Sequence, residues 1–234
     1  MVSPALHYYY DPLCGWCYGA APLIAMAASL PGVALHLHAG GMLAGDQRRT
    51  ISPAWRDFVL PHDQRIAELT GQPFGTGYRD GLLRDGTAML DSAPPISAIL
   101  AAESAAGMGL PMLHHLQQAH YVAGLQIAAP AVLHQLAADL GLDTQAYTNA
   151  YDKLQGTETA SHIATSRAQM AQLGARGFPT LVLVYGTQQE VLPLDRYLGQ
   201  PAAWQAWLRD RLANVGSKSQ PSQQLTCDTA TCTV

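Results

Sequence analysis

The chain has 234 residues, of which 48% are hydrophobic and only 13% are charged, and its formal net charge is −4. This length suits one large domain, or a small domain with a sizeable insertion, and without a basic patch to bind phosphates no nucleic-acid partner is expected. No stretch approaches the ~20 apolar residues that span a bilayer, and the first residues lack the basic and apolar regions of a signal peptide, so we expect a cytoplasmic protein with no membrane partner.

The first 40 residues predict a βαβ unit. Residues 6–10 are aromatic or apolar nearly throughout and predict a central strand. Residues 14–30 predict a helix that ends at Pro31-Gly32, and residues 33–38 alternate as a second strand. Because a helix joins them, the two strands should be parallel.

Glycines close this unit. Gly40, Gly41 and Gly45 follow the second strand, but neither phosphate-loop pattern occurs there. We expect them at turns and close contacts, where glycine suits special backbone geometry.

The middle of the chain is predicted to be helical, and the end returns to strands. The clearest periodic runs between residues 53 and 156 are Ser97 to Ala106, His114 to Leu125, and Val132 to Leu140. The last elements should be a helix over 158–173, a buried strand over 181–185, its hairpin partner over 189–194, and a helix over 202–212.

This order predicts an α/β protein of the form β-α-β, helical block, α-β-β-α. After Asn214 the composition turns to Gly, Ser, Lys, Gln and Pro, which predicts a flexible tail. The expected domains are one α/β domain from residues 1–50 and 157–213, an inserted helical domain over 51–156, and a tail over 214–234.

The motif Cys14-Gly15-Trp16-Cys17 lies where the first strand ends and the helix begins. The N-terminus of a helix stabilises an anion, so Cys14 should be the attacking thiolate. Cys17 is one turn deeper on the same face and should be the resolving thiol. Gly15 and Trp16 would help to set the redox potential, but the dipeptide alone does not assign the direction of electron flow.

A zinc site is the alternative interpretation of this motif. Structural zinc needs four ligands, and Cys227 and Cys232 would have to supply the other two from the polar tail. The nine histidines follow no metal-binding pattern. A redox pair is therefore favoured, and no metal is expected.

Phe178-Pro179 is the second candidate site segment. An X-Pro bond just before the third strand can be cis and can face the cysteine pair. The backbone of Phe178 would then offer its N–H and C=O to an extended peptide, as in strand addition.

The sequence resembles the DsbA family of thioredoxin-fold proteins, and in particular its FrnE-like, predicted disulfide-isomerase branch. The resemblance covers residues 5 to 213 and rests on three segments: Tyr10-Asp11-Pro12-Leu13-Cys14-Gly15-Trp16-Cys17-Tyr18-Gly19, Gly40-Gly41, and Gly177-Phe178-Pro179-Thr180. It implies a thioredoxin-like fold with a large helical insertion after the second strand, and catalysis by Cys14, Cys17 and a cis Pro179. It also implies protein or peptide disulfides as substrates and glutathione or a thioredoxin-type protein as recycling partner, with no cofactor.

Two departures from the family pattern matter. Periplasmic DsbA oxidases have Pro-His where this chain has Gly-Trp, and tryptophan cannot stabilise a thiolate by charge. Tyr8 stands where thioredoxins and DsbA-type oxidases bury a carboxylate. Asp11 is the nearest acid, and it either exchanges protons or only forms the Asp-Pro turn.

Some FrnE-like proteins carry a further CX4C pair near the C-terminus, which Cys227 and Cys232 resemble. We hypothesise that this pair exchanges electrons with the active site, and an independent disulfide or idle thiols are the alternative.

The sequence therefore predicts a thiol–disulfide oxidoreductase that acts through a mixed disulfide. The alternatives are a zinc-binding or redox-sensing module without turnover, and a glutathione-linked transferase or isomerase of the same superfamily. Relatives of the latter kind have serine in place of the first cysteine, so Cys14 argues against it. The choice between reductase, oxidase and isomerase stays open, as do the substrate and the oligomeric state.

Overall fold

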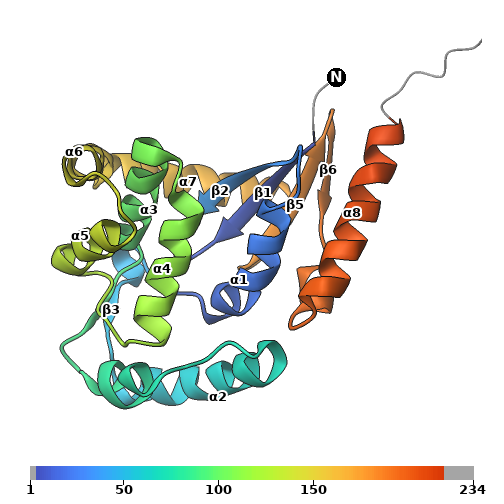
Figure 1. Cartoon of the computed structure of the whole chain (residues 1–234). Coiled ribbons are helices and arrows are strands. Elements are labelled where there is room, and N and C mark those ends of the chain that lie inside the picture. The colour runs from blue at the N-terminus through green and yellow to red at the C-terminus, as the bar shows by residue number, and fades with distance from the viewer. Residues whose placement is uncertain (1–3, 219–234) are drawn as a thin grey trace, which may run out of the picture.

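The computed structural model describes residues 4–218 and has an α/β fold with many helices. Its main sheet has the order β2-β1-β5-β6, and the two inner strands are β1 and β5 (Figure 1). The strands are β1 (Ala5–Tyr10), β2 (Ala34–Ala39), β5 (Thr180–Tyr185) and β6 (Gln188–Val191). β1 pairs with β2 in parallel through α1 (Gly15–Ala28), which confirms the predicted βαβ unit. β5 is antiparallel to β1, and β6 is antiparallel to β5.

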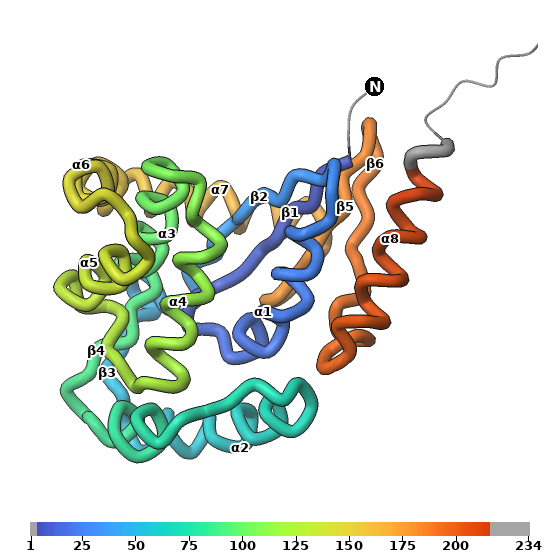
Figure 2. Tube along the Cα trace, viewed as in Figure 1, coloured from blue at the N-terminus to red at the C-terminus, as the bar shows by residue number. Residues whose placement is uncertain are grey.

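Helices cover both faces of this sheet, because the side chains of the inner strand β1 are apolar or aromatic in both directions. Leu6, Tyr8 and Tyr10 point into the large core that they share with α1. Tyr9 points the other way and packs with Val182 and with residues of α7 (Thr157–Gln172). Figure 2 shows α1 in front of the sheet and α7 behind it.

The last helix, α8 (Pro201–Lys218), lies beside α1 on the same side of the sheet. Trp204 of α8 is fully buried, and its indole Nε1 donates to the backbone oxygen of Leu23 at 2.9 Å. This contact fixes α8 against the helix that carries the cysteine motif.

Between β2 and α7 the chain forms a helical block. Its helices are α2 (Pro53–Thr70), α3 (Ala93–Ala106), α4 (Gly109–Tyr121), α5 (Pro130–Asp139) and α6 (Thr144–Leu154). In Figure 1, α3 to α6 gather at one side of the sheet, and α2 crosses below α4 and α1. α3 begins before the predicted run because Pro94 and Pro95 occupy its first turn, where no backbone N–H is needed.

Several short elements were not predicted from the sequence. β3 (Arg49–Thr50) and β4 (Met89–Leu90) form a two-stranded sheet. This sheet holds together the two ends of the segment over residues 51–88, which contains α2. The other short elements are η1 (Gly45–Gln47), the π-helical η2 (Gly77–Gly81), η3 (Leu82–Arg84) and η4 (Leu194–Tyr197). These segments are too short for a periodic pattern to reveal them.

α2 packs closely on α1 because two glycines face it. A Cβ atom at Gly19 would lie 2.8 Å from Cγ2 of Ile66, and one at Gly15 would lie 3.1 Å from Cδ1 of the same residue. A side chain at either position would require Ile66 to shift. The helical block therefore reaches the first turn of the helix that bears the cysteine motif.

The predicted start of the C-terminal tail at residue 214 is wrong. α8 continues to Lys218, and Val215 is only 2% exposed because it belongs to the apolar face that packs on the core. Cys227 and Cys232 lie outside the described residues. Within residues 4–218, no helix is long and apolar enough to cross a membrane.

Candidate active site

Cys14 lies at the junction between the inner strand β1 and helix α1. It is the N-cap residue of α1, with extended backbone angles, and its N–H donates to the backbone oxygen of Asp11 at 3.2 Å. The side chain is 6% exposed and its Sγ lies 3.6 Å from the backbone oxygen of Phe178. Cys14 therefore stands at the N-terminus of α1, and its side chain accepts no capping hydrogen bond from the first helical turn.

Cys17 lies one turn further along α1 and is fully buried. Both cysteines are free thiols in this structure. Burial raises the pKa of the Cys17 thiol, and the neighbouring Cys14 thiol raises it further. Cys17 is thus held as a neutral thiol, shielded from solvent behind Cys14.

Tyr8 of β1 lies beside this pair, at the position where the family pattern has a carboxylate. Its pKa is raised well above the ordinary value, first by burial and then by the charges of Cys17 and Cys14. A neutral phenol therefore borders the resolving thiol.

The segment before β5 faces the cysteine motif, and its Phe178–Pro179 peptide bond is cis. The Phe178 ring lies over Gly40, where a Cβ atom would be 1.9 Å from Cζ of the ring. The Phe178 carbonyl that Cys14 contacts is thus placed by the loop after β2.

That loop is held from the other face of the sheet. Arg167 of α7 donates from Nε to the backbone oxygen of Gly40 and from Nη2 to that of Gly41, each at 2.6 Å. Gly41 has a φ of 62°, and a Cβ atom there would lie 2.8 Å from Ile163. The expected turn and close-packing roles of these two glycines are confirmed.

Asp11 holds three segments together through hydrogen bonds to its carboxyl group. It is fully buried, and its Oδ1 accepts hydrogen bonds from the Leu13 N–H at 2.8 Å and the Ser92 hydroxyl at 3.0 Å. Its Oδ2 accepts from the N–H of Met42 at 2.5 Å. Burial raises the pKa of Asp11 to about 6, although these hydrogen bonds oppose the rise. The carboxylate joins the end of β1, the loop after β2 and the start of α3.

Two grooves flank Trp16 of the cysteine motif. One, of about 360 Å³, lies toward the proline segment and is lined by Trp16, Arg65, Leu69, Phe178, Pro179, Leu194, Asp195 and Leu198. The other, of about 260 Å³, lies toward the helical block and is lined by Leu13, Cys14, Gly15, Trp16, Met42, Trp55, Phe58, Val59, His62, Asp63 and Ile66. Cys14 opens directly into the second groove.

The contribution of α2 to this site was not predicted from the sequence. Trp55, Val59 and Ile66 lie on one face of α2, and Asp63 interrupts this apolar face. Asp63 is 5% exposed, and burial raises its pKa to about 7. The sequence did carry a signal for this site, because Asp63 stands at a position where the helical pattern of α2 would place an apolar side chain.

The geometry around Cys14 and Cys17 is that of a dithiol pair and offers no metal cage. Within residues 4–218, no group of three or more His, Cys, Asp or Glu side chains could hold a metal ion. The Phe178 carbonyl on one side and an open groove on the other suit a substrate sulfur that approaches Cys14.

A buried dithiol at the first turn of the first helix, opposite a proline segment on a sheet of this order, defines the thioredoxin-like class of redox proteins. The chain belongs to the DSBA-like thioredoxin domain family, whose model matches residues 5–198. A search of curated proteins found no match.

Solved structures are similar over nearly their full length. The cytosolic disulfide reductase DsbM from Pseudomonas aeruginosa is 50% identical, with 90% of this chain and 99% of that chain covered and a TM-score of 0.85. The structure of DsbM with GSH is 49% identical, with 89% and 99% covered and a TM-score of 0.83. A protein from Nitrosomonas europaea that is described as a protein disulfide isomerase is 25% identical, with 91% and 98% covered and a TM-score of 0.75. This chain is accordingly a protein disulfide oxidoreductase.

Proposed function

We propose that the chain is a cytoplasmic disulfide reductase that works through Cys14 and Cys17. The observation that carries the proposal is the position of the Cys14 sulfur at the N-cap of α1, in contact with the Phe178 carbonyl and open to a groove. The similarity to a cytosolic disulfide reductase at 50% identity supports both the direction and the location.

In the proposed cycle, the Cys14 thiolate attacks one sulfur of the substrate disulfide. A Cys14–substrate disulfide forms, and the other substrate sulfur leaves and takes a proton. Cys17 then attacks the Cys14 sulfur, so that the Cys14–Cys17 disulfide forms and the second substrate thiol is released. Two electrons have passed from the protein dithiol to the substrate.

The reducing direction has a physical reason in the dipeptide between the cysteines. A strongly oxidising pair is one whose reduced form is stabilised. Trp16 adds no positive charge near Cys14, so the thiolate has less stabilisation than a histidine at that position would give. We expect a pair closer to thioredoxin than to periplasmic oxidases.

We further propose that glutathione restores the dithiol. Two glutathione thiols would reduce the Cys14–Cys17 disulfide and leave as one oxidised glutathione. The groove beside Pro179 carries one cationic side chain, Arg65, and one anionic side chain, Asp195, which suits a small peptide with both carboxylate and ammonium groups. The similar DsbM structure with GSH supports this choice of reductant.

The decisive measurement is the equilibrium of the Cys14–Cys17 pair against glutathione, in protein with Cys227→Ser and Cys232→Ser. We expect a potential near that of thioredoxin, about −270 mV, and far from the roughly −120 mV of DsbA. Failure to form a Cys14–Cys17 disulfide at any glutathione ratio would contradict the proposal.

A trapping experiment tests the order of the two cysteines. In the same background, Cys17→Ser should accumulate a mixed disulfide on Cys14 with a substrate peptide, detected by mass spectrometry. The matched Cys14→Ser protein should accumulate none, because buried Cys17 is shielded from the substrate. Trapping on Cys17 in that control would reverse the assigned roles.

A further inference from the structure

A single buried carboxyl of the helical block reaches the first turn of α1. Asp63 of α2 is 5% exposed, and its Oδ1 lies 3.2 Å from the position that a Cβ atom would have at Gly15. Gly15 is the first residue of α1 and directly follows Cys14. Asp63 and Cys14 also line the same groove. Two groups that can carry a negative charge thus share one helix N-terminus.

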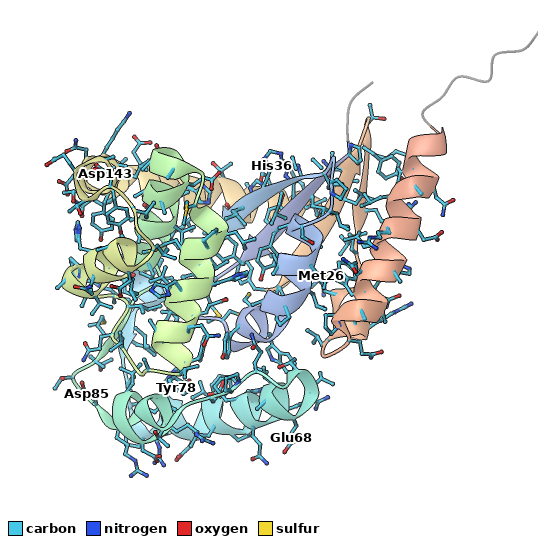
Figure 3. All side chains as sticks on the ribbon, in the orientation of Figure 1. Met26, His36, Glu68, Tyr78, Asp85 and Asp143 are labelled. Atoms are coloured by element: carbon cyan, nitrogen blue, oxygen red, sulfur yellow. The ribbon has the colours of Figure 1, made fainter. Side chains whose placement is uncertain are left out.

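The partners of Asp63 leave its charge poorly compensated. The Tyr78 hydroxyl donates to Oδ2 at 2.9 Å, and within residues 4–218 no ion pair involves Asp63. Burial raises the pKa of Asp63 to about 7, and the hydrogen bond from Tyr78 opposes the rise. In Figure 3, Tyr78 lies on the inner side of α2 and Glu68 on its outer side.

Titratable groups surround Asp63 on three elements. His62 of α2 lines the same groove, Tyr78 comes from η2, and His120 and Tyr121 of α4 line a smaller pocket behind Asp63. Burial lowers the pKa of His120 to about 4, so this histidine is neutral near pH 7 and supplies no counter-charge.

Tyr121 is a buried phenol near both the Asp63 carboxyl and the cysteines. The pKa of its phenol is raised first by burial and then by the charges of Tyr78, Cys14, Asp63 and Cys17. One buried phenol therefore lies within electrostatic range of both Cys14 and Asp63. In a groove with mostly apolar walls, such charges interact more strongly than they do in water.

We propose that Asp63 is a redox-linked proton acceptor, so that one negative charge lies on the Cys14 sulfur in the reduced protein and on Asp63 in the oxidised protein. This inference rests on the proposed function of Cys14 as the attacking thiolate. Asp63 is supplied by α2, whereas Tyr8 belongs to β1.

The balance of the reaction shows what Asp63 contributes. The reduced site holds the Cys14 thiolate, the Cys17 thiol and the protonated Asp63 carboxyl. Reduction of one substrate disulfide forms the Cys14–Cys17 disulfide and releases two substrate thiols. The two protons that these thiols need come from Cys17 and Asp63, and one negative charge passes from the Cys14 sulfur to the Asp63 carboxylate.

The charge on Asp63 should shift the dithiol–disulfide equilibrium in a definite direction. Ionised Asp63 repels the Cys14 thiolate, so it favours the disulfide, whereas neutral Asp63 does not. In the Cys227→Ser, Cys232→Ser background, wild-type Asp63 and Asp63→Asn should therefore have similar equilibria with glutathione at pH 5.5. At pH 8.5 we expect the Asp63→Asn dithiol to be about tenfold harder to oxidise than the wild-type dithiol.

Two further variants separate charge coupling from a packing role. Glu68→Gln removes a carboxylate from the exposed side of the same helix and should follow the wild type at every pH. Tyr78→Phe removes the hydrogen bond that lowers the pKa of Asp63, so its pH-dependent step should move to higher pH. The latter variant also tests the proposal if Asp63→Asn does not fold.

The protonation change of Asp63 is tested by combining the glutathione equilibria from pH 5.5 to 8.5 with infrared difference spectra of reduced and oxidised protein. We expect a protonated-carboxyl band in the reduced protein at pH 7.5 that disappears on oxidation and is missing in Asp63→Asn. The proposal is overturned, although the Cys14–Cys17 pair still works, if the glutathione equilibria of Asp63→Asn and the wild type depend on pH in the same way. It is also overturned if Tyr78→Phe leaves the pH-dependent step where it is in the wild type. If no such disulfide forms in any variant, the proposed function and this inference both fail.

Discussion

Two buried carboxyls near the cysteine motif differ in their hydrogen-bond partners. Asp11 accepts three hydrogen bonds, two of them from backbone N–H groups, and has a pKa raised to about 6. Asp63 accepts one from Tyr78, and its pKa is raised to about 7. The first holds three segments together, whereas the second lies at the edge of a groove. The second is the carboxyl that we propose to change its protonation state during turnover.

The environment of Asp63 predicts a cost in stability at high pH. Its folded pKa of about 7 exceeds the unfolded value of 3.8, so the folded state binds the proton more tightly, and stability on this account falls as the pH rises from about 4 to 7. Asp63→Asn should raise the free energy of unfolding by about 2–4 kcal/mol at pH 8 and change it little at pH 4.

Urea unfolding of both proteins at pH 4 and pH 8 measures this difference. Glu68→Gln is the control, because it changes an exposed carboxyl of the same helix. Equal destabilisation of Asp63→Asn at both pH values would show that the carboxyl is needed for packing instead.

At the scale of elements, the site depends on two loops that meet at one close contact. Gly40 follows β2 and Phe178 precedes β5, and the phenyl ring occupies the space that any Cβ at Gly40 would need. The Phe178 carbonyl is the group that contacts the Cys14 sulfur. A change in the loop after β2 therefore reaches the cysteine motif through the Phe178 ring, in addition to the hydrogen bond from Met42 to Asp11.

Gly40→Ala should displace the Phe178 ring and lower disulfide reductase activity, with a loss of about 1–3 kcal/mol in stability from overpacking. Adding Phe178→Leu to Gly40→Ala should recover part of both, because the smaller side chain leaves room for the methyl group. Gly81→Ala is the matched control, since a Cβ there meets nothing within 4 Å. Similar losses in Gly40→Ala and Gly81→Ala would contradict this account.

At the scale of the whole molecule, buried histidines and buried carboxyls act in opposite directions on the pH dependence of stability. Burial lowers the pKa of His38 and His120 to about 4, below the ordinary value of 6.5. The unfolded chain binds their protons more tightly, so stability on their account is full above about pH 6.5 and is lost as the pH falls toward 4. The pKa values of His7, His114 and His162 are lowered as well.

Because more histidines than carboxyls are shifted, we expect stability to rise from pH 4.5 to a maximum near pH 6.5. Stability should fall again above about pH 9. At that pH the unfolded chain loses the protons of Cys17 and the tyrosines, whereas the folded protein, in which their pKa values are raised, keeps them. Urea unfolding across this range tests the profile. His120→Gln should reduce the difference in the free energy of unfolding between pH 4.5 and 6.5 by about 1–3 kcal/mol. A steady fall from pH 4.5 to 6.5 would contradict the prediction.

Much of the fold follows from local patterns in the sequence. The strand over residues 6–10, the helix after it and the alternation over 33–38 predicted the parallel βαβ unit, and an apolar run predicted the buried strand β5. Asn214 was predicted to begin a tail, and this was wrong because composition does not show that Val215 packs on the core. The short strands β3 and β4 form through pairing across 40 residues, which no local pattern reveals.

The chain's own sequence determined the chemistry that is available: a dithiol at a strand–helix junction and a proline before a strand. It determined these features because they depend on residues that are neighbours along the chain. Tertiary structure alone decided that α2 lies across the first turn of α1 and brings Asp63 beside Gly15, since that contact joins segments 48 positions apart. It also decided the protonation of the site, because a pKa depends on burial and on neighbours from other elements, such as Tyr78 and His120.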